Sequence, residues 1–251
     1  NIDFVCLENP ISIEAPVLKN IIRQTVFATS QSEKKPILTG VNLKLHENKL
    51  TAIATDSYRL SKVIVPINGD YNDFNITIPN KTYEDCLDLY FSNNSLLFKF
   101  KNVLFQTRLL DGTYPDTSRL IPPSFPINIK FNKEELLEAV ERVSLLSPRD
   151  KEKDREITYS IIKLLLKNDQ SVEISTENAQ IGDAKEEIIP TGINSSETIR
   201  IGFSSRYLVE ALRSFTSQEV TLNFSEAIRP FVISSEAEPN LCQLILPVRM
   251  D

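Results

Sequence analysis

The stretch IRIGFSSRYLVEALRSF, residues 199–215, changes its hydrophobic period in the middle. Its first residues alternate between apolar and polar side chains, which is typical of a strand with one buried face. From Ser204 onward the apolar side chains recur at helical spacing, and Ser204 or Ser205 is expected to cap the helix. The sequence therefore predicts a strand that runs directly into an amphipathic helix. The buried face of this helix is expected to consist of Tyr207, Leu208, Ala211, Leu212 and Phe215.

Three other stretches show the same change of period. They are ISIEAPVLKNIIRQTVFA from Ile11, ITIPNKTYEDCLDLYF from Ile76 and INIKFNKEELLEAVERVSLL from Ile127. In the last of them, Asn132 and Glu135 have the spacing of a capping box, which supports a helix start at this point. We therefore expect four strand-to-helix units. The shared face of the first helix is expected to be Leu18, Ile21, Ile22, Thr25 and Val26.

Strands are expected after each helical stretch. Val41, Leu43 and Leu45 alternate with polar residues, then comes a polar HENK turn, and then Leu50, Ala52 and Ala54. Similar runs occur in SLLFKF and VLFQTRLL, in YSIIKLLLKNDQSVEIST and in EVTLNFSEAIRPFVISS. The repeating unit is β-α-β-β-β, used four times in two pairs. Helices on one face of antiparallel sheets make this an α+β architecture.

Proline residues indicate where one pair of units ends. Pro115, Pro122, Pro123 and Pro126 crowd the middle of the chain, and proline resists both helices and central strands. We place the boundary near residue 125, which predicts one domain over residues 1–125 and a second over residues 126–251.

Composition narrows the class of protein. With 41% hydrophobic and 25% charged residues, the 251-residue chain is typical of a soluble globular protein rather than a disordered or membrane-spanning one. The net charge of −6 argues against a protein that is basic all over, although a local basic strip remains compatible with it. The only methionine is Met250, so we expect the chain to be a fragment that lacks its N-terminal part.

The three cysteines are far apart and have no CxxC spacing. They predict neither a disulfide framework nor a zinc site, and we expect no metal and no cofactor. Buried, reduced thiols in a reducing compartment are the expected state of Cys6, Cys86 and Cys242.

The segment ATDSYRL, residues 54–60, is the strongest candidate for chemistry. A serine nucleophile needs a base, and the single histidine, His46, lies in the polar HENK turn, so a triad is not expected. No GxGxxG or P-loop pattern is present. Locally, Asp56 and Ser57 fit a strand-ending Asx turn with Arg59 paired to a nearby acid. Two alternatives remain open at this point: an acid/base hydrolase or transferase using Asp56, Arg59 and Asp111, and a β-rich interaction scaffold.

Five separated motifs resemble one family. KKPILTGVNLKL (residues 34–45) and LTAIATDSYRLS (residues 50–61) resemble the second domain of the bacterial DNA sliding clamps, the β subunit of DNA polymerase III. LLDGTYPDTSRLIP (residues 109–122), IGFSSRYLVEALRS (residues 201–214) and LILPVRM (residues 244–250) are similar to the same family in the same order. The resemblance covers essentially the whole chain.

The resemblance implies a DNA-clamp fold and the second and third domains of a three-domain subunit. It implies a cytoplasmic processivity clamp, which is not an enzyme and has no membrane contact. In the family, two subunits form a head-to-tail homodimeric ring, with antiparallel sheets outside and helices lining the inner face around duplex DNA. This chain alone is expected to be a monomer. The implied partners are the replicative polymerase α subunit, the clamp loader, other polymerases and repair proteins, which bind through short linear motifs.

The family also implies a peptide-binding groove made from both domains. Apolar side chains with a few polar groups are the usual mixture in such a site. Three positions depart from the family, which commonly has histidine at Tyr58 and often has glycine at Ser57 and asparagine at Ser204. A family phenylalanine expected near residues 149–159 has no clear counterpart, so no residue is assigned there. The predicted peptide-binding residues are Leu38, Thr55, Ser57, Tyr58, Arg59, Leu60, Pro115, Arg119, Leu120, Ser204, Tyr207, Ile228, Pro230, Leu244, Leu246, Pro247, Val248, Arg249 and Met250.

Basic residues on the helices are candidates for weak, nonspecific contact with the DNA backbone. Glu134, Glu138, Glu141 and Glu210 lie among them, and a mixed polar face is commonly just a solvated one. The predicted DNA-facing residues are Lys19, Arg23, Lys34, Lys35, Lys133, Arg142, Arg206 and Arg213.

Overall fold

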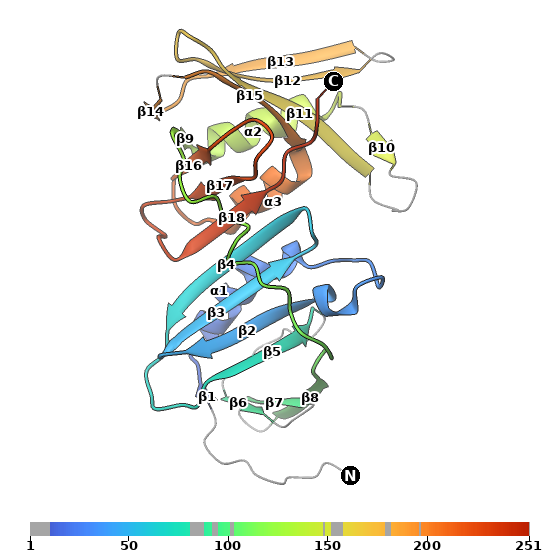
Figure 1. Cartoon of the computed structure of the whole chain (residues 1–251), viewed down its shortest axis with the longest axis vertical. Helices are drawn as coiled ribbons and strands as arrows, with labels where there is room; N and C mark the ends of the chain where they lie inside the picture. The colour runs from blue at the N-terminus through green and yellow to red at the C-terminus, as the bar shows by residue number, and fades with distance from the viewer. Residues whose placement is uncertain are drawn as a thin grey trace. The chain divides into compact units, whose positions relative to one another are not determined.

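The chain forms two compact units in a computed structural model, Asn1–Pro115 and Asp116–Asp251 (Figure 1). The boundary predicted near residue 125 falls in the second unit, in the irregular segment before its first strand, and stays a prediction. The structure describes residues 11–80, 88–91, 95–100, 103–147, 149–151, 158–178, 182–195 and 197–250.

The described residues of the first unit form two antiparallel sheets and one α-helix. One sheet has the strand order β4-β3-β2-β5, and the other has the order β1-β6-β7-β8. The elements are β1 (Ile11–Ser12), α1 (Ala15–Thr25), the 3₁₀ turns η1 (Val26–Ala28) and η2 (Pro36–Thr39), β2 (Gly40–His46), β3 (Lys49–Thr55), β4 (Arg59–Pro66), β5 (Phe74–Pro79), β6 (Asp88–Phe91), β7 (Ser95–Phe100) and β8 (Val103–Arg108).

The hairpin of β2 and β3 follows the predicted alternation. Leu43 lies opposite Ala52 in the antiparallel register, and the apolar residues of both strands are buried. The turn residues Glu47 and Asn48 have φ values of 48° and 58°, and positive φ at both positions matches the twist that a two-residue hairpin turn requires. The predicted strands and the HENK turn are therefore confirmed.

Helix α1 packs against β3 and β4 and covers one face of their sheet (Figure 1). Leu18, Ile21 and Thr25 of the predicted face are buried, whereas Ile22 and Val26 are half-buried. Gln24 is also buried, and its backbone carbonyl accepts a hydrogen bond of 2.5 Å from the hydroxyl of Ser61 on β4. The helix is therefore attached to the sheet by polar as well as apolar contacts.

The stretch that starts at Ile76 differs from its prediction. Residues 81–87 of the expected helix lie outside the described residues, and Asp88–Phe91 form the strand β6. In the antiparallel register, Leu89 pairs with Ile11 of β1 on one side and with Phe98 of β7 on the other. The prediction of a helix through Phe91 was wrong.

In the second unit, the part of the chain that the structure describes forms two α-helices and two antiparallel sheets. One sheet contains the strands β14-β9-β16-β17-β18, and the other contains β10-β11-β12-β13 with β15 paired to β11. The elements are β9 (Ile127–Asn132), α2 (Lys133–Ser144), β10 (Arg149–Lys151), β11 (Thr158–Leu166), β12 (Val172–Asn178), β13 (Gly182–Ile188), β14 (Gly192–Asn194), β15 (Ile199–Ser204), α3 (Ser205–Ser214), β16 (Glu219–Phe224), β17 (Phe231–Ser234) and β18 (Leu241–Ile245).

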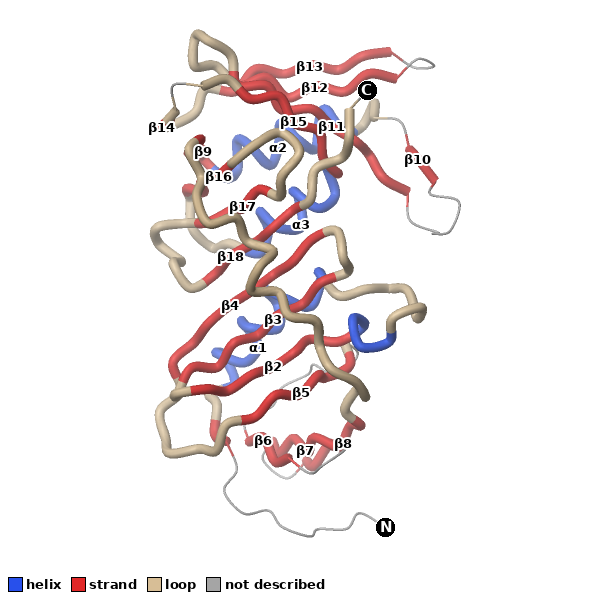
Figure 2. The backbone as a smooth tube through the Cα atoms, in the orientation of Figure 1, coloured by secondary structure: helices blue, strands red, loops and turns tan. Residues whose placement is uncertain are grey.

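Helices α2 and α3 pack against each other and against both sheets of this unit (Figure 2). The rings of Phe203 and Phe224 each lie 5.1 Å, centroid to centroid, from the ring of Phe231. The five residues of the predicted α3 face are all buried, which confirms the helical periodicity of the opening stretch. The core of this unit therefore lies between the helices and the strands that precede and follow them.

The two predicted helix caps have different outcomes. The side chain of Asn132 accepts hydrogen bonds from the amides of Glu134 at 3.0 Å and Glu135 at 3.2 Å, so the cap of α2 is confirmed. Ser204 occupies the N-cap position of α3, but its side chain makes no capping hydrogen bond, and Ser205 is already the first helical residue. The predicted position of the cap at Ser204 is therefore confirmed, but the side-chain hydrogen bond of a serine cap is not formed.

The cysteine prediction is contradicted at one position. Cys242 on β18 is half-buried, whereas a fully buried thiol was expected. It alternates with the buried Leu241 and Gln243 along the strand, so its side chain points to the opposite face of the sheet. Cys6 and Cys86 lie outside the described residues. Within the described ranges, no helix has the length and apolar character needed to cross a membrane.

Candidate functional site

The turn between β3 and β4 is held by the side chains of its own residues. The carboxylate oxygen Oδ1 of Asp56 accepts hydrogen bonds from the amides of Tyr58 at 3.0 Å and Arg59 at 3.2 Å. The hydroxyl of Thr55 accepts from the amide of Ser57 at 3.1 Å and donates to the carbonyl of Arg59 at 2.6 Å. The predicted Asx turn is therefore confirmed, because polar side chains replace the strand ladder at the point where the chain reverses.

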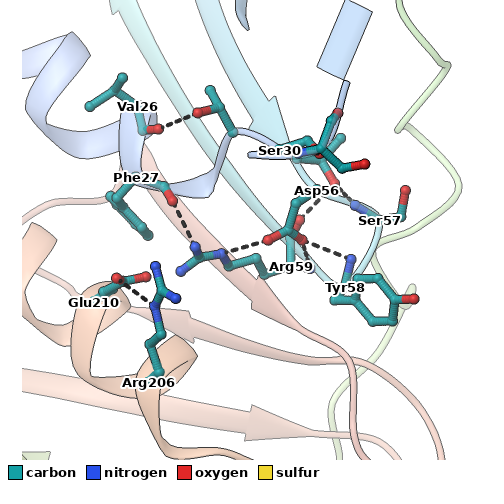
Figure 3. A network of polar contacts seen from close by, with 12 residues as sticks. Val26, Phe27, Ser30, Asp56, Ser57, Tyr58, Arg59, Arg206 and Glu210 are labelled. Carbon is teal, nitrogen blue, oxygen red and sulfur yellow. Dashed lines mark hydrogen bonds and ion pairs between the residues drawn. The ribbon is translucent and has the colours of Figure 1, made fainter. Parts of the chain in front are cut away.

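Arg59 is buried within this turn rather than extended into solvent. It is 5% exposed, and its Nε lies 3.1 Å from Oδ2 of Asp56. Its Nη2 donates to the carbonyl of Phe27 at 2.7 Å, and its guanidinium carbon lies 5.4 Å from the centroid of the Phe27 ring (Figure 3). The predicted pairing of Arg59 with a nearby acid is confirmed. Its contact with a peptide stays a prediction, and the structure gives it a role in positioning the turn.

Ser57 is the exposed apex of the turn and has a φ of 81°. This left-handed region is costly for residues with a Cβ and is open to glycine. The geometry therefore explains why a glycine is compatible with this position. Ser57 is exposed, and Asp56 and Tyr58 are half-buried.

Tyr114, which the sequence reasoning did not single out, lies near this turn. Burial raises the pKa of its phenol well above the ordinary value, with the backbone of Thr55 lowering it in part and the Asp56 carboxylate raising it further. The residue is 9% exposed, so its ring belongs to the packing beneath the turn. A tyrosine next to a proline gave no periodic signal by which sequence reasoning could have found it.

The geometry gives no support to the hydrolase or transferase alternative. Asp56 is engaged by Arg59 and by two backbone amides, so its carboxylate is a structural acceptor. Asp111 is an exposed residue, and His46 lies with its Nδ1 2.5 Å from Oδ2 of Asp73, with 59% of its side chain exposed. No group of three or more His, Cys, Asp or Glu side chains in the described ranges is arranged to hold a metal ion.

In the second unit, the predicted site residues gather where the C-terminal segment crosses β15. The amide of Val248 donates to the carbonyl of Gly202 at 2.8 Å, which forms an isolated antiparallel bridge. Leu246, Pro247 and Met250 are half-buried along this segment. Val248 is 36% exposed, and the segment therefore presents apolar side chains at the surface.

The other predicted residues of this unit differ in exposure. Leu244, Ser204 and Tyr207 are buried, and the hydroxyl of Ser204 has no hydrogen-bond partner among the residues that the structure describes. Ile228, in the connection between β16 and β17, is 76% exposed, and Leu120 is 45% exposed. Pro230 is half-buried, whereas Arg119 and Arg249 are exposed.

The predicted residues of the first unit divide in the same way. Leu38, Thr55 and Leu60 are buried core residues in this structure, whereas Pro115 is exposed. The turn thus brings Thr55, Ser57, Tyr58, Arg59 and Leu60 together, and the C-terminal segment gathers a second group by itself. Membership of all these residues in one peptide-binding surface stays a prediction.

Acidic neighbours engage the predicted DNA-facing cations of the second unit. Arg142 binds both oxygens of Glu186, at 2.5 and 3.1 Å, and also contacts Glu138 at 3.2 Å. These hydrogen bonds lower the pKa of the Glu186 carboxyl. Further pairs join Lys133 to Glu134 at 3.1 Å, Arg206 to Glu210 at 3.0 Å and Arg213 to Glu141 at 2.6 Å.

In the first unit, the basic candidates are exposed. Lys19 and Arg23 lie on the solvent side of α1, and the guanidinium of Arg23 donates to the side chain of Asn20 at 2.8 Å. Lys34 and Lys35 lie in the loop before η2. The role of the cations of both units in DNA contact stays a prediction.

Sequence reasoning also missed Leu145. The helical pattern continued through VSLL and suggested one buried stripe, but α2 ends at Ser144. The side chain of Leu145 is 79% exposed and that of Leu146 is 36% exposed. The two leucines therefore expose apolar surface at the C-terminal end of α2. The only available signal was the Ser-Pro pair that follows them.

Comparisons with known proteins agree across the whole chain. Residues 12–116 match the DNA polymerase III beta subunit, central domain, and residues 118–249 match the DNA polymerase III beta subunit, C-terminal domain. The beta sliding clamp of Bacillus subtilis (strain 168) is 40% identical over 253 residues, which cover 95% of this chain and 64% of that protein. The chain therefore spans somewhat less than two thirds of that relative's length.

Solved structures give the same answer for the fold. The crystal structure of the DNA polymerase sliding clamp from Bacillus subtilis has a TM-score of 0.90 and 38% identity, and the match covers 100% of this chain and 67% of that one. The DNA polymerase III beta chain from Streptococcus pneumoniae has a TM-score of 0.91 and 35% identity, with the same coverage. The predicted α+β clamp fold is confirmed, and the chain belongs to the DNA polymerase III beta subunit family, the bacterial sliding clamps, of which it carries the central and C-terminal domains.

Proposed function

We propose that this chain acts as part of a processivity clamp that encircles duplex DNA and tethers the replicative polymerase in the cytoplasm. The observation that carries the proposal is the similarity of both units, in chain order, to the central and C-terminal domains of one subunit type. The work of such a protein is topological and adhesive. No catalytic role is therefore assigned to Asp56 or Arg59, whose contacts with each other and with the backbone support a structural role.

The ring requires each subunit to present a surface to its neighbour. Leu145 and Leu146, at the C-terminal end of α2, are suited to such a surface because they expose apolar area that water solvates poorly. We assign them to a subunit junction of the full homodimeric ring. DNA would pass through the ring in contact with scattered lysine and arginine side chains, without sequence readout.

The surface that tethers partners is proposed to include the exposed part of the β3–β4 turn and the C-terminal segment. Tyr58 supplies a half-buried ring with a polar tip, and Leu246 and Val248 supply apolar surface. This combination fits an extended peptide with a glutamine followed by leucine and phenylalanine. The glutamine would form hydrogen bonds with polar groups such as the Tyr58 hydroxyl, and the leucine and phenylalanine of the peptide would be buried against Leu246 and Val248.

Such a peptide is expected to bind with micromolar affinity. Micromolar affinity corresponds to about 8 kcal/mol. An aromatic anchor in an apolar pocket contributes about 2–4 kcal/mol of this, and the other apolar and polar contacts of the peptide supply the rest after its ordering cost. The replicative polymerase α subunit, the clamp loader, other polymerases and repair proteins would each carry a segment of this kind. They would therefore compete for one surface.

The experiment that tests this function is calorimetric titration of the chain with a peptide containing Gln-Leu-Phe. Leu246→Asp should abolish binding because it places a charge in the apolar part of the surface. Ile189→Asp is the matched control, since Ile189 is 82% exposed in the same unit and is not assigned to the peptide surface. Equal affinities for the folded Leu246→Asp variant and the original chain would overturn the proposed surface.

A further inference from the structure

A glycine in β15 lies directly beneath the side chain of Met250. A Cβ atom at Gly202 would lie 2.8 Å from Cγ and 2.9 Å from Sδ of Met250. A Cβ atom does not tolerate non-bonded heavy atoms closer than 3.0 Å, so no larger residue fits at Gly202 unless Met250 moves. A glycine inside a strand commonly marks such a close approach.

The backbone at this point is fixed from both sides. Gly202 pairs with Lys163 of β11 in the antiparallel register, and its carbonyl accepts the amide of Val248 at 2.8 Å. A Cβ at this position would lie 3.6 Å from the carbonyl oxygen of Val248, which is an ordinary contact. An added methyl group would therefore leave the strand and the C-terminal backbone in place and displace the methionine side chain.

Met250 is the side chain that yields because it is unbranched and adaptable. It is half-buried at the end of the C-terminal segment, near the exposed Val248. In the present structure, the missing side chain at Gly202 provides the space for its Cγ and Sδ. The rotamer of Met250 thus depends on the absence of a Cβ on a strand remote from it in sequence.

We propose that Gly202 is a positioning residue, which fixes where Met250 lies and thereby shapes the peptide-binding surface. The link to the peptide rests on the proposed function, whereas the control of Met250 by Gly202 is a property of this unit alone. Gly202 itself is buried, so no direct contact with the peptide is assigned to it. Its effect on affinity passes entirely through the methionine.

The test uses Gly202→Ala with Gly192→Ala as the matched control. Gly192 also lies in an antiparallel strand opposite a lysine, Lys130, and a Cβ there meets only the Cβ of Lys130 at an ordinary 3.6 Å. Gly202→Ala should weaken binding of the Gln-Leu-Phe peptide about fivefold, which is within the range of coupling between two residues in contact, here Gly202 and Met250. Gly192→Ala should leave the affinity unchanged. The peptide should bind the double variant Gly202→Ala, Met250→Ala no more weakly than Met250→Ala alone.

The second readout does not need the peptide. Met250 is the only methionine of the 251-residue sequence, so a chain labelled with ¹³C-methyl methionine gives one methyl resonance for this side chain. That resonance should shift in Gly202→Ala and stay in place in Gly192→Ala. If the original chain bound no peptide but the resonance shifted as expected, the proposed function would fail and the control of Met250 by Gly202 would stand. An unchanged resonance in a folded Gly202→Ala variant would overturn the inference, and so would an additive loss of affinity in the double variant.

Discussion

The side chain of Asp56 binds Arg59 twice, once through the Arg59 backbone amide at 3.2 Å and once through its Nε at 3.1 Å. One acidic residue thus closes the turn and neutralises the guanidinium that the turn buries. The side chain of Asp56 is 13% exposed and that of Arg59 is 5% exposed, so solvent screens the pair only weakly. The turn and the ion pair should therefore be lost together.

Removal of the Asp56 carboxylate should destabilise the first unit. Asp56→Ala leaves the buried guanidinium of Arg59 without its acid, which costs about 3 kcal/mol on the scale for broken buried pairs. Asp56→Asn keeps an oxygen for the turn amides and should cost less, about 1–2 kcal/mol. Urea unfolding measures both values. Asp73→Asn, at the exposed pair with His46, should cost less than about 0.5 kcal/mol, and an equal cost at both sites would refute the buried-pair argument.

Replacement of Ser57 by glycine should stabilise the chain. The left-handed backbone at φ 81° costs a residue with a Cβ about 1–2 kcal/mol, and glycine removes this cost. Glycine also makes the unfolded chain more flexible, which lowers the free energy of unfolding by about 0.4–1 kcal/mol. The net gain is then about 0.5–1 kcal/mol, read from the urea midpoint at constant slope. Ser118→Gly is the control, because Ser118 is exposed and its backbone lies outside the left-handed region, and this change should destabilise. A loss of stability in Ser57→Gly would contradict the strain argument.

Glu173 should make the second unit sensitive to acid. Hydrogen bonds from Lys185, at 2.6 Å, and from Lys167, at 3.0 Å, lower its pKa below the ordinary 4.5. A group whose folded-state pKa is lowered adds stability above its unfolded pKa and loses it as the pH falls through the folded value. The free energy of unfolding of the original chain should therefore exceed that of Glu173→Gln at neutral pH, and the two values should converge as the pH falls below 4.5.

The control for that measurement is Glu226→Gln, at an exposed pair 4.0 Å from Arg229. Its stability difference from the original chain should stay small across the same pH range. If Glu173→Gln and the original chain showed parallel curves down to acid pH, the two lysines would not be the source of the effect.

The ion pairs of α2 should keep DNA contact weak. Glu186 holds the Nε and Nη2 edge of Arg142, whereas Nη1 donates to Glu138, so Glu186→Gln should make the Nε and Nη2 edge available to a phosphate. Each added phosphate contact steepens the dependence of log K on log salt by about 0.9, and affinity for duplex DNA at low salt should rise. Fluorescence anisotropy over a salt series measures the slope.

Glu226→Gln changes the net charge by the same amount and serves as the control, because Glu226 makes a long, exposed ion pair of 4.0 Å with one arginine, Arg229. It should raise affinity slightly with no change of slope. Equal slopes for the two variants would mean that overall charge, rather than the release of Arg142, governs the contact.

Much of the fold could be predicted because its signals are local. The alternation of Val41, Leu43 and Leu45 and the helical face from Tyr207 to Phe215 each depend on neighbours within a few residues. The strand at Asp88–Phe91 was missed because it also pairs with β1, at Ile11 and Ser12, and a contact so distant in sequence leaves no local signal.

The site was predicted less completely for the same reason. The Asx turn at Asp56 involves only adjacent residues and could be predicted from them. The burial of Arg59 depends on Phe27, and the packing of Met250 against Gly202 joins two distant segments. Charge alone favoured an exposed arginine, and no pattern in the sequence measures how close two distant segments come. The exposure of Leu145 likewise depends on where α2 stops.

The β3–β4 turn is already ordered before any partner arrives, because Thr55 and Asp56 fix its amides and Phe27 fixes its arginine. A rigid receptor forfeits little conformational freedom on association, so most of the entropic penalty falls on the incoming segment. Competition between ligands should then depend on how flexible each one is when unbound. A partner segment that is already extended when unbound should dissociate more slowly than a flexible segment with the same contact residues. The dissociation rates of the partners would then set how fast they exchange.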